Sequence, residues 1–256
     1  MTHPNDAWDY FRNDPQYSEV LKNRLTSGVE MDSAKALGHY VNQLCRGDLR
    51  LLDFGGGPGH YGPVIQRLYQ HGSLRYTSVD IDAANIAFGS QHFADDPTMA
   101  LQVGSVLTPK ACYGGQNCIV SANTLPHVPT IAPLLGLLAG EARIEYFVCR
   151  MLIGNECVQI KKHLREHDFA GLFEQHYQHN NIYSAAYLQQ ALGPAWHISI
   201  EPDIFDVERL QQHHVPAQDS DPFYANRVSR PVGTMIFKGD IYMPWRFVLG
   251  HRSAQP

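Results

Sequence analysis

Hydrophobic residues follow a repeating order of strand, turn and helix from residue 49 onward. Short apolar runs predict five strands, and segments with apolar residues at helical spacing separate most of them. Strands that alternate with helices in this way predict an α/β fold with a doubly wound, mostly parallel sheet and helices on both faces. The predicted strands are 51–54, 74–80, 99–103, 118–122 and 144–153, and the predicted helices are 60–71, 83–93 and 129–140.

The segment before this core has a different pattern. Residues 1–48 mix aromatic and charged residues at helical spacing, which predicts an N-terminal helical cap with a longer helix over about 30–47. Each aromatic residue of this cap could simply pack an N-terminal helix on the core, or the aromatic residues as a group could form a lid over the end of the first strand. Residues 49–256 would then form the core domain.

After residue 155 the periodicity weakens. Residues 158–173 and 183–192 are predicted to be helical, and 196–200 to form a strand. Residues 203–234, rich in Asp, His, Pro and Gln, predict a polar insertion. The two apolar runs beyond it, 235–237 and 245–249, predict an antiparallel hairpin that closes the sheet edge.

Four glycines within five positions follow the first predicted strand, in the sequence Leu-Leu-Asp-Phe-Gly-Gly-Gly-Pro-Gly-His-Tyr-Gly over residues 51–62. Glycines at such a turn let the backbone adopt positive φ and let a ligand approach closely. The helix that follows would offer free N–H groups at its start. The pattern therefore predicts a cofactor-binding loop.

The same loop contains a literal dinucleotide fingerprint. Residues 57–62 have the spacing G-x-G-x-x-G, and Asp80 follows about 20 residues later. Two observations weigh against a dinucleotide: two more glycines stand between the strand and the fingerprint, and Asp53 would place negative charge beside a pyrophosphate. A cationic amine or sulfonium ligand suits Asp53 better.

Four motifs occur in order, each at the carboxyl end of a predicted strand. Residues 51–59 are an apolar strand with an acid that leads into G-x-G-x-G, and residues 77–82 end the second strand with acids. Residues 103–106 end the third strand, and residues 117–128 form the fourth strand and its loop. Together these motifs, within residues 49–153, resemble those of the class I, Rossmann-like S-adenosylmethionine-dependent methyltransferases. The resemblance implies that fold, with S-adenosylmethionine as the cofactor.

The resemblance also implies roles for individual residues. Asp53 and the loop backbone would hold the methionine amine of the cofactor, and Asp80 would accept hydrogen bonds from the ribose hydroxyls. The alternative for Asp80 is the N-cap of the following helix. Ser105 stands where the family usually has an acid for the adenine amino group, so this contact would weaken or move to the backbone. Ser121 and Asn123 would line the floor under the methionine moiety. The cofactor-binding residues implied are Asp53, Gly55, Gly56, Gly57, Gly59, Asp80, Ile81, Ser105, Val106, Ser121 and Asn123.

Two residues are candidates for catalysis. Methyl transfer to a hydroxyl needs an aligned nucleophile and benefits from a base. His127, in the loop after the fourth strand, is the candidate base, with a packed loop histidine as the alternative. Arg150 could bind a carboxylate or phosphate of the substrate, or could pair with an acid such as Glu156.

The function predicted from these residues is methyl transfer to a small-molecule hydroxyl, in a sugar or a secondary metabolite. One alternative is an NAD(P)-dependent oxidoreductase, which the dinucleotide spacing would favour. Another is a non-catalytic protein that keeps the cofactor on the methyltransferase fold, because the catalytic residues form no strong motif.

The composition narrows the range of partners. There are 20 Lys and Arg residues against 25 Asp and Glu, a net charge of −5, and no dense basic run. We therefore expect a small-molecule partner rather than nucleic acid or a membrane surface. The five cysteines lack Cys-x-x-Cys spacing, which predicts buried, reduced thiols in a cytoplasmic protein. We expect neither a signal peptide nor a membrane span.

Several histidines lie close together in the second half of the chain. His163 and His167 would share a face of the predicted helix, with His176 and His179 after them. No carboxylate completes a recognised metalloenzyme pattern with these histidines, so we expect no metal site.

Overall fold

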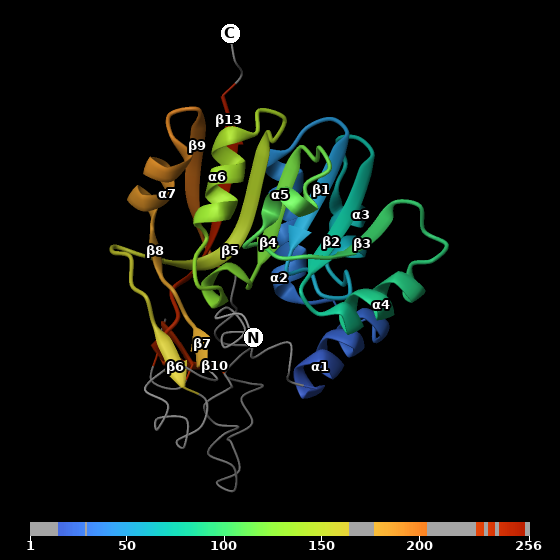
Figure 1. The fold of residues 1–256 in the computed structure, drawn as a ribbon, viewed down its shortest axis with the longest axis horizontal. Coiled ribbons are helices and arrows are strands. Elements are labelled where there is room, and N and C mark those ends of the chain that lie inside the picture. The colour runs from blue at the N-terminus through green and yellow to red at the C-terminus, as the bar shows by residue number, and fades with distance from the viewer. Residues whose placement is uncertain are drawn as a thin grey trace, which may run out of the picture.

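An eight-stranded sheet forms the centre of the computed structural model, which describes residues 15–28, 30–163, 177–203, 229–232, 235–238 and 241–253 (Figure 1). In spatial order its strands are β3 (Met99–Val103), β2 (Leu74–Asp80), β1 (Leu49–Phe54), β4 (Cys118–Ala122), β5 (Tyr146–Gly154), β13 (Trp245–Arg252) and β9 (Trp196–Pro202), and the short β8 (Tyr183–Ser184) pairs with β5.

The predicted doubly wound, mostly parallel sheet is confirmed. β1 pairs in parallel with both β2 and β4, β2 pairs with β3, and β4 pairs with β5. The strand order reverses at β1 and β4, so the carboxyl ends of these two neighbours lie at a topological switch point. Ligands bind at such points in open parallel sheets.

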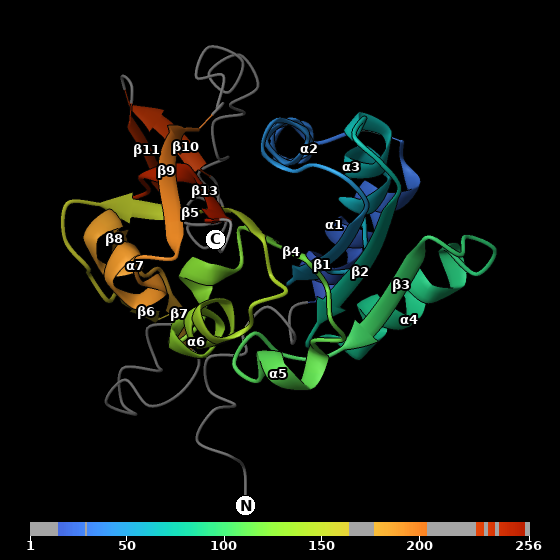
Figure 2. The ribbon, with the colours of Figure 1, turned by 90° about the horizontal axis from the view of Figure 1, so that it is seen from above.

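Helices cover both faces of the sheet (Figure 2). On one face α2 (Asp32–Leu44) and α3 (Gly62–Leu68) pack on the side of the sheet that includes Leu51. On the other face lie α5 (Pro109–Cys112), α6 (Ala132–Gly140) and α7 (Ala185–Leu192), against the side that includes Leu52. Neighbouring residues of β1 therefore point into two separate cores, as expected of a strand covered on both faces.

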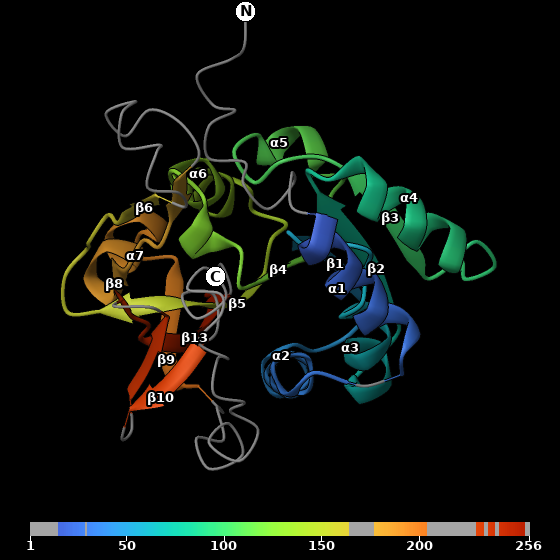
Figure 3. The same ribbon diagram turned by 90° about the horizontal axis from the view of Figure 1, so that it is seen from below.

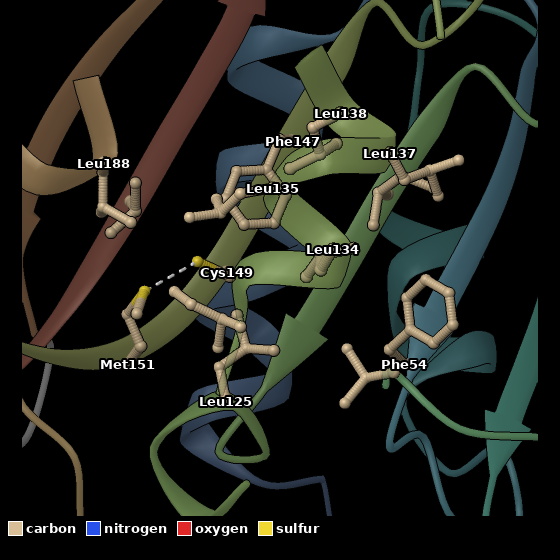
Figure 4. Close-up of a cluster of buried hydrophobic side chains, with 14 of the residues drawn as sticks. Phe54, Leu125, Leu134, Leu135, Leu137, Leu138, Phe147, Cys149, Met151 and Leu188 are labelled. Atoms are coloured by element: carbon tan, nitrogen blue, oxygen red, sulfur yellow. Dashed lines mark hydrogen bonds between the residues drawn. The ribbon is translucent and has the colours of Figure 1, made fainter. Parts of the chain in front are cut away.

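The core under α6 is rich in leucine (Figure 4). Four leucines of this helix are buried together with Phe54, Phe147 and Leu188 from the sheet and α7. A helix that is apolar on most of its surface is stable only when it is covered, which explains why the leucine-rich helix predicted over 129–140 packs in the interior. The four buried leucines are Leu134, Leu135, Leu137 and Leu138.

Two further helices lie beside the carboxyl ends of the first strands. α1 (Pro15–Thr26) packs against α4 (Ala83–His92), and Figure 3 shows α1 across the ends of β1 and β2. The helices predicted N-terminal to the core are thus present as α1 and α2. The aromatic residues before residue 15 lie outside the described residues, and the domain boundary at residue 48 stays a prediction.

The helix predicted over 158–173 is wrong at its start. Lys161–His163 forms strand β6, which pairs with β7 (Tyr177–His179), and Val158 bridges Ile182. Apolar residues at 158 and 160 alternate with polar ones, and a run as short as this fits the period of a helix as well as that of a strand. Residues 164–176 lie outside the described residues.

An antiparallel strand near the C-terminus is confirmed, but the predicted hairpin between 235–237 and 245–249 is wrong, because these two segments belong to different sheets. β13 runs antiparallel to both β5 and β9 and lies between them, so β9 forms the sheet edge. Residues 235–237 belong instead to β11 (Met235–Lys238), in a small sheet with β10 (Ser229–Val232) and β12 (Ile241–Tyr242). Most of the polar insertion predicted over 203–234 lies outside the described residues.

No helix in the described ranges has the length and apolar character needed to cross a bilayer. All five cysteines are free thiols, as predicted. Four of them are buried, but Cys157 is exposed, which corrects the expectation that all are buried.

Candidate active site

The glycine loop after β1 leaves no room for side chains. Gly55, Gly57 and Gly59 have φ angles of 78°, 55° and 84°, which a residue with a β carbon rarely adopts. A β carbon on Gly55 would lie 1.9 Å from Thr124 Oγ1, and one on Gly56 would lie 2.4 Å from the Ser78 hydroxyl. The loop glycines are therefore required by the packing of the loop on β2 and on the segment after β4.

Asp53 lies beneath this loop and is 1% exposed. The Tyr76 hydroxyl donates a hydrogen bond to Asp53 Oδ2, whereas Oδ1 has no hydrogen-bond partner among the described residues. Burial, opposed in part by the Tyr76 hydrogen bond, raises the pKa of Asp53 to about 7. The loop thus covers a carboxyl group with one unsatisfied oxygen, a costly arrangement that a cationic ligand would relieve.

A second acid, Asp80, stands half-buried at the end of β2. Its Oδ2 accepts a hydrogen bond from the Gly57 N–H at 2.9 Å, and its Oδ1 accepts one from the Asp82 N–H at 2.9 Å. The N-cap of α4 is Asp82, which accepts from the Ala84 N–H at 2.8 Å and from Asn85 Nδ2 at 2.9 Å. The N-cap alternative for Asp80 is therefore wrong, and its carboxylate lies at the loop.

The loop after β3 comes to the same edge. The Gly104 N–H donates to the Asp80 carbonyl at 2.9 Å, which places Ser105 close to the end of β2. The Ser105 hydroxyl accepts from the Leu107 N–H at 3.1 Å, and Val106 is buried in the core under α6. Ile81, between the two acids, is partly exposed.

The two polar residues at the end of β4 have different surroundings. Ser121 is fully buried, and its hydroxyl donates to the Phe54 carbonyl at 2.7 Å, so it joins β4 to β1 under the loop. Asn123 has φ of 66° and is the one non-glycine residue at positive φ in the described part of the chain. Its Nδ2 donates to the Tyr61 hydroxyl at 3.1 Å, and its Oδ1 accepts from Arg150. These bonds explain how Asn123 keeps a conformation that costs other residues energy.

Arg150 is buried in an ion pair. Its Nε and Nη2 donate to the two carboxylate oxygens of Asp203 at 3.0 and 2.5 Å, and its guanidinium lies 4.1 Å from the centre of the Trp245 ring. Of the two roles predicted, substrate binding or pairing with an acid, the geometry therefore supports the pairing. The acid is Asp203 rather than Glu156, which is exposed. The guanidinium positions Asn123 and joins β5 to the end of β9.

His127 lies at the carboxyl edge in a short 3-10 helix, η3 (Leu125–His127). Its Nδ1 is 2.8 Å from the His179 carbonyl and 3.2 Å from Gln178 Nε2. A carbonyl can only accept, so the shorter contact assigns the proton to Nδ1 and leaves Nε2 as the basic nitrogen. The Trp245 ring lies edge-on with its centre 6.4 Å from that of the imidazole.

Sequence reasoning missed several partners at this edge. Tyr76 faces Asp53, Tyr61 joins Asn123 to the Ser33 hydroxyl, and Gln178 contacts His127. The alternation along β2, which puts Tyr76, Ser78 and Asp80 on one side, could have identified the tyrosine. In the part of the chain that the structure describes, no three His, Cys, Asp or Glu side chains gather as metal ligands, and His167 and His176 lie outside it.

The buried pair of Arg150 and Asp203 gives a first prediction. Arg150→Met removes one partner and leaves the Asp203 carboxylate buried, so it should lower the free energy of unfolding by about 3–5 kcal/mol. Urea unfolding measures this change. The matched control is Arg67→Met, which breaks the more exposed 2.7 Å pair with Glu30 and should cost less than about 1 kcal/mol. Equal losses in the two variants would contradict the buried pair.

Comparisons by sequence assign the chain to no family, because no family model and no curated protein matches it. Solved structures do match. A chain of the complex between the Haloferax volcanii Trm112 methyltransferase activator and a putative methyltransferase has a TM-score of 0.55 at 10% identity, over 96% of this chain and 97% of that one. The magnesium protoporphyrin IX methyltransferase ChlM of Synechocystis PCC 6803, with bound S-adenosylmethionine, has a TM-score of 0.53 at 12% identity, over 99% and 98%.

The mitomycin 7-O-methyltransferase MmcR also matches, with a TM-score of 0.52 at 11% identity, over 96% of this chain and 61% of that one. At these identities the likeness is one of fold. It agrees with the parallel strands β1 to β5, the antiparallel β13 and the N-terminal helices described above. The chain therefore has the class I S-adenosylmethionine-dependent methyltransferase fold.

Proposed function

We propose that this protein transfers a methyl group from S-adenosylmethionine to a hydroxyl of a small molecule. The observation that carries the proposal is the Asp53 carboxyl, buried beneath the glycine loop with one oxygen unpartnered among the described residues. The amino group of S-adenosylmethionine is a cation that would satisfy this oxygen. A dinucleotide would bring a pyrophosphate to the same place, where the acid would repel it.

The residues at the carboxyl edge fit the rest of the cofactor. Asp80 would accept hydrogen bonds from the ribose hydroxyls, and the loop after β3, with Ser105 and Val106, would border the adenine. Gly55 and Gly57 would let the methionine moiety lie against the loop backbone. Asn123, held by Arg150 and Tyr61, would border the methionine moiety from the β4 side. When bound, the cofactor supplies a methyl group on a positively charged sulfur.

The strand order also favours methyl transfer over hydride transfer. The dinucleotide-binding fold has six parallel strands in the order 3-2-1-4-5-6. Here β13 runs antiparallel between β5 and β9. MmcR, by its name an O-methyltransferase, shares this fold, which supports a hydroxyl as the acceptor.

His127 is the proposed general base. With its Nδ1 proton donated to the His179 carbonyl, Nε2 would take the proton of the acceptor hydroxyl as the oxygen forms its bond to the methyl group. The Gln178 side chain and the Trp245 ring restrict the orientation of the imidazole. Alignment of the acceptor oxygen would supply the remaining rate enhancement, because the sulfonium already carries a good leaving group.

Isothermal titration tests the cofactor assignment. The wild-type protein should bind S-adenosylhomocysteine and not NAD, and Asp53→Ala should weaken binding about ten- to a hundredfold because it removes a charge-assisted hydrogen bond. The control is Asp95→Ala, an exposed acid after α4, which should bind as the wild type does. Binding of NAD in place of S-adenosylhomocysteine would overturn the proposal in favour of the oxidoreductase.

A variant of His127 tests the catalytic assignment. Once an acceptor is found by screening metabolites with labelled cofactor, His127→Ala should lower kcat by about 10²- to 10⁴-fold and leave the affinity for S-adenosylhomocysteine unchanged. His197→Ala, at the exposed start of β9, serves as the control with wild-type turnover. Full turnover by the His127 variant would refute the base and leave the cofactor assignment intact.

A further inference from the structure

Helix α1 packs directly on the glycine loop. Leu21 is buried, and its Cδ1 lies 3.3 Å from the point where a β carbon on Gly57 would stand. The Ser18 hydroxyl donates to Asn85 Oδ1 at 3.0 Å, and the Lys22 ammonium lies 5.7 Å from the centre of the Phe88 ring. A second side of α1 therefore contacts α4. Figure 3 shows the resulting position of α1 across the ends of β1 and β2. Any ligand on the loop at Gly57 therefore lies beside α1.

His60 lies in the loop beneath α1 and has unsatisfied polar atoms. Both ring nitrogens are buried without a hydrogen-bond partner among the described residues, and the ring centre lies 4.6 Å from that of Tyr61. Burial, and secondarily the positive charge of Arg24, lower the pKa of His60 to about 3, so the ring is neutral near pH 7. A neutral imidazole with two unpartnered nitrogens has one N–H to donate to a ligand.

Arg24, in the last turn of α1, has no counterion among the residues that the structure describes. It is partly buried, and within the described ranges it forms no hydrogen bond or ion pair. Arg24 stands three residues after Leu21 on α1, so it shares the face of the helix that packs on the loop at Gly57. Burial raises the pKa of Tyr61, and the Ser33 hydrogen bond and the charges of Arg150 and Arg24 lower it in part, which agrees with this position of Arg24. Arg150 is paired with Asp203, whereas Arg24 has no such acid within the described part of the chain. Of these two guanidinium groups, Arg24 is therefore the one that the described residues leave available to an anion at the loop.

The amino-acid end of S-adenosylmethionine carries both charges, an ammonium and a carboxylate on the same carbon atom. With the ammonium at Asp53, the carboxylate must lie close to the same loop and needs a cationic partner. We propose that Arg24 on α1, with the N–H of His60, binds the carboxylate of the cofactor, so that α1 acts as a clamp on its amino-acid end. This inference rests on the proposed function and adds α1 to the binding site.

The experiment compares two ligands that differ in one group. S-adenosylmethionine and decarboxylated S-adenosylmethionine share the ammonium, ribose and adenine, and only the first has the carboxylate. In isothermal titration the wild-type protein should bind S-adenosylmethionine about ten- to a hundredfold more tightly. Arg24→Gln should remove most of that preference by weakening S-adenosylmethionine alone, and His60→Ala should reduce it in part.

Lys22→Gln is the matched control, since it removes a positive charge from the same helix on the side that faces Phe88. It should keep the wild-type preference. Equal affinity of the wild type for the two ligands, or an equal loss of both in Arg24→Gln, would overturn the clamp while the proposed function stands. The comparison of the two ligands on the wild-type protein does not depend on whether any variant folds. Failure of the wild type to bind either ligand would overturn the proposed function itself.

Discussion

The buried carboxyl of Asp53 is the constraint on which the carboxyl edge of this sheet depends. It is 1% exposed, it receives one hydrogen bond, from Tyr76, and its other oxygen has no partner among the described residues. A β carbon on Gly56 would lie 2.9 Å from Asp53 Oδ2, so the loop can cover the acid only because it lacks side chains there. A buried acid with an unsatisfied oxygen lowers the stability of the protein when no ligand is bound. Local losses of stability of this kind are typical of functional sites.

Two arginines at this edge of the sheet have different surroundings, and we propose a binding role for only one of them. Arg150 forms a two-point ion pair with Asp203, and its remaining hydrogen bond holds Asn123 at positive φ. It therefore fixes the backbone at the end of β4 rather than offering charge to a ligand. Arg24, carried by a helix that packs on the loop, has no such partner in the described part of the chain. A zwitterionic ligand between Asp53 and α1 would balance both groups.

Much of this arrangement follows from local sequence. Apolar runs predicted β1 to β5 because buried parallel strands must be continuously hydrophobic, and glycines mark the loop because no other residue fits its backbone. The acids at 53 and 80 are recognisable because each lies within the last two residues of an apolar strand, just before a turn. The pairing of Arg150 with Asp203 is different, because it joins residues 53 positions apart. No local pattern specifies such a contact, and the same applies to His127 with Gln178 and to the insertion of β13 between β5 and β9.

The most direct test of the account is the proton balance of cofactor binding. With a pKa of about 7, Asp53 is largely protonated at pH 6.5 in the free protein, and an ammonium beside it would hold it ionised. Titration of S-adenosylhomocysteine at pH 6.5, in buffers with different enthalpies of ionisation, should therefore show release of about half a proton or more, and affinity should rise as the pH increases through 7. Asp53→Asn should release none. Binding by the wild-type protein without proton release, or with the same release in the variant, would contradict the central role of this carboxyl.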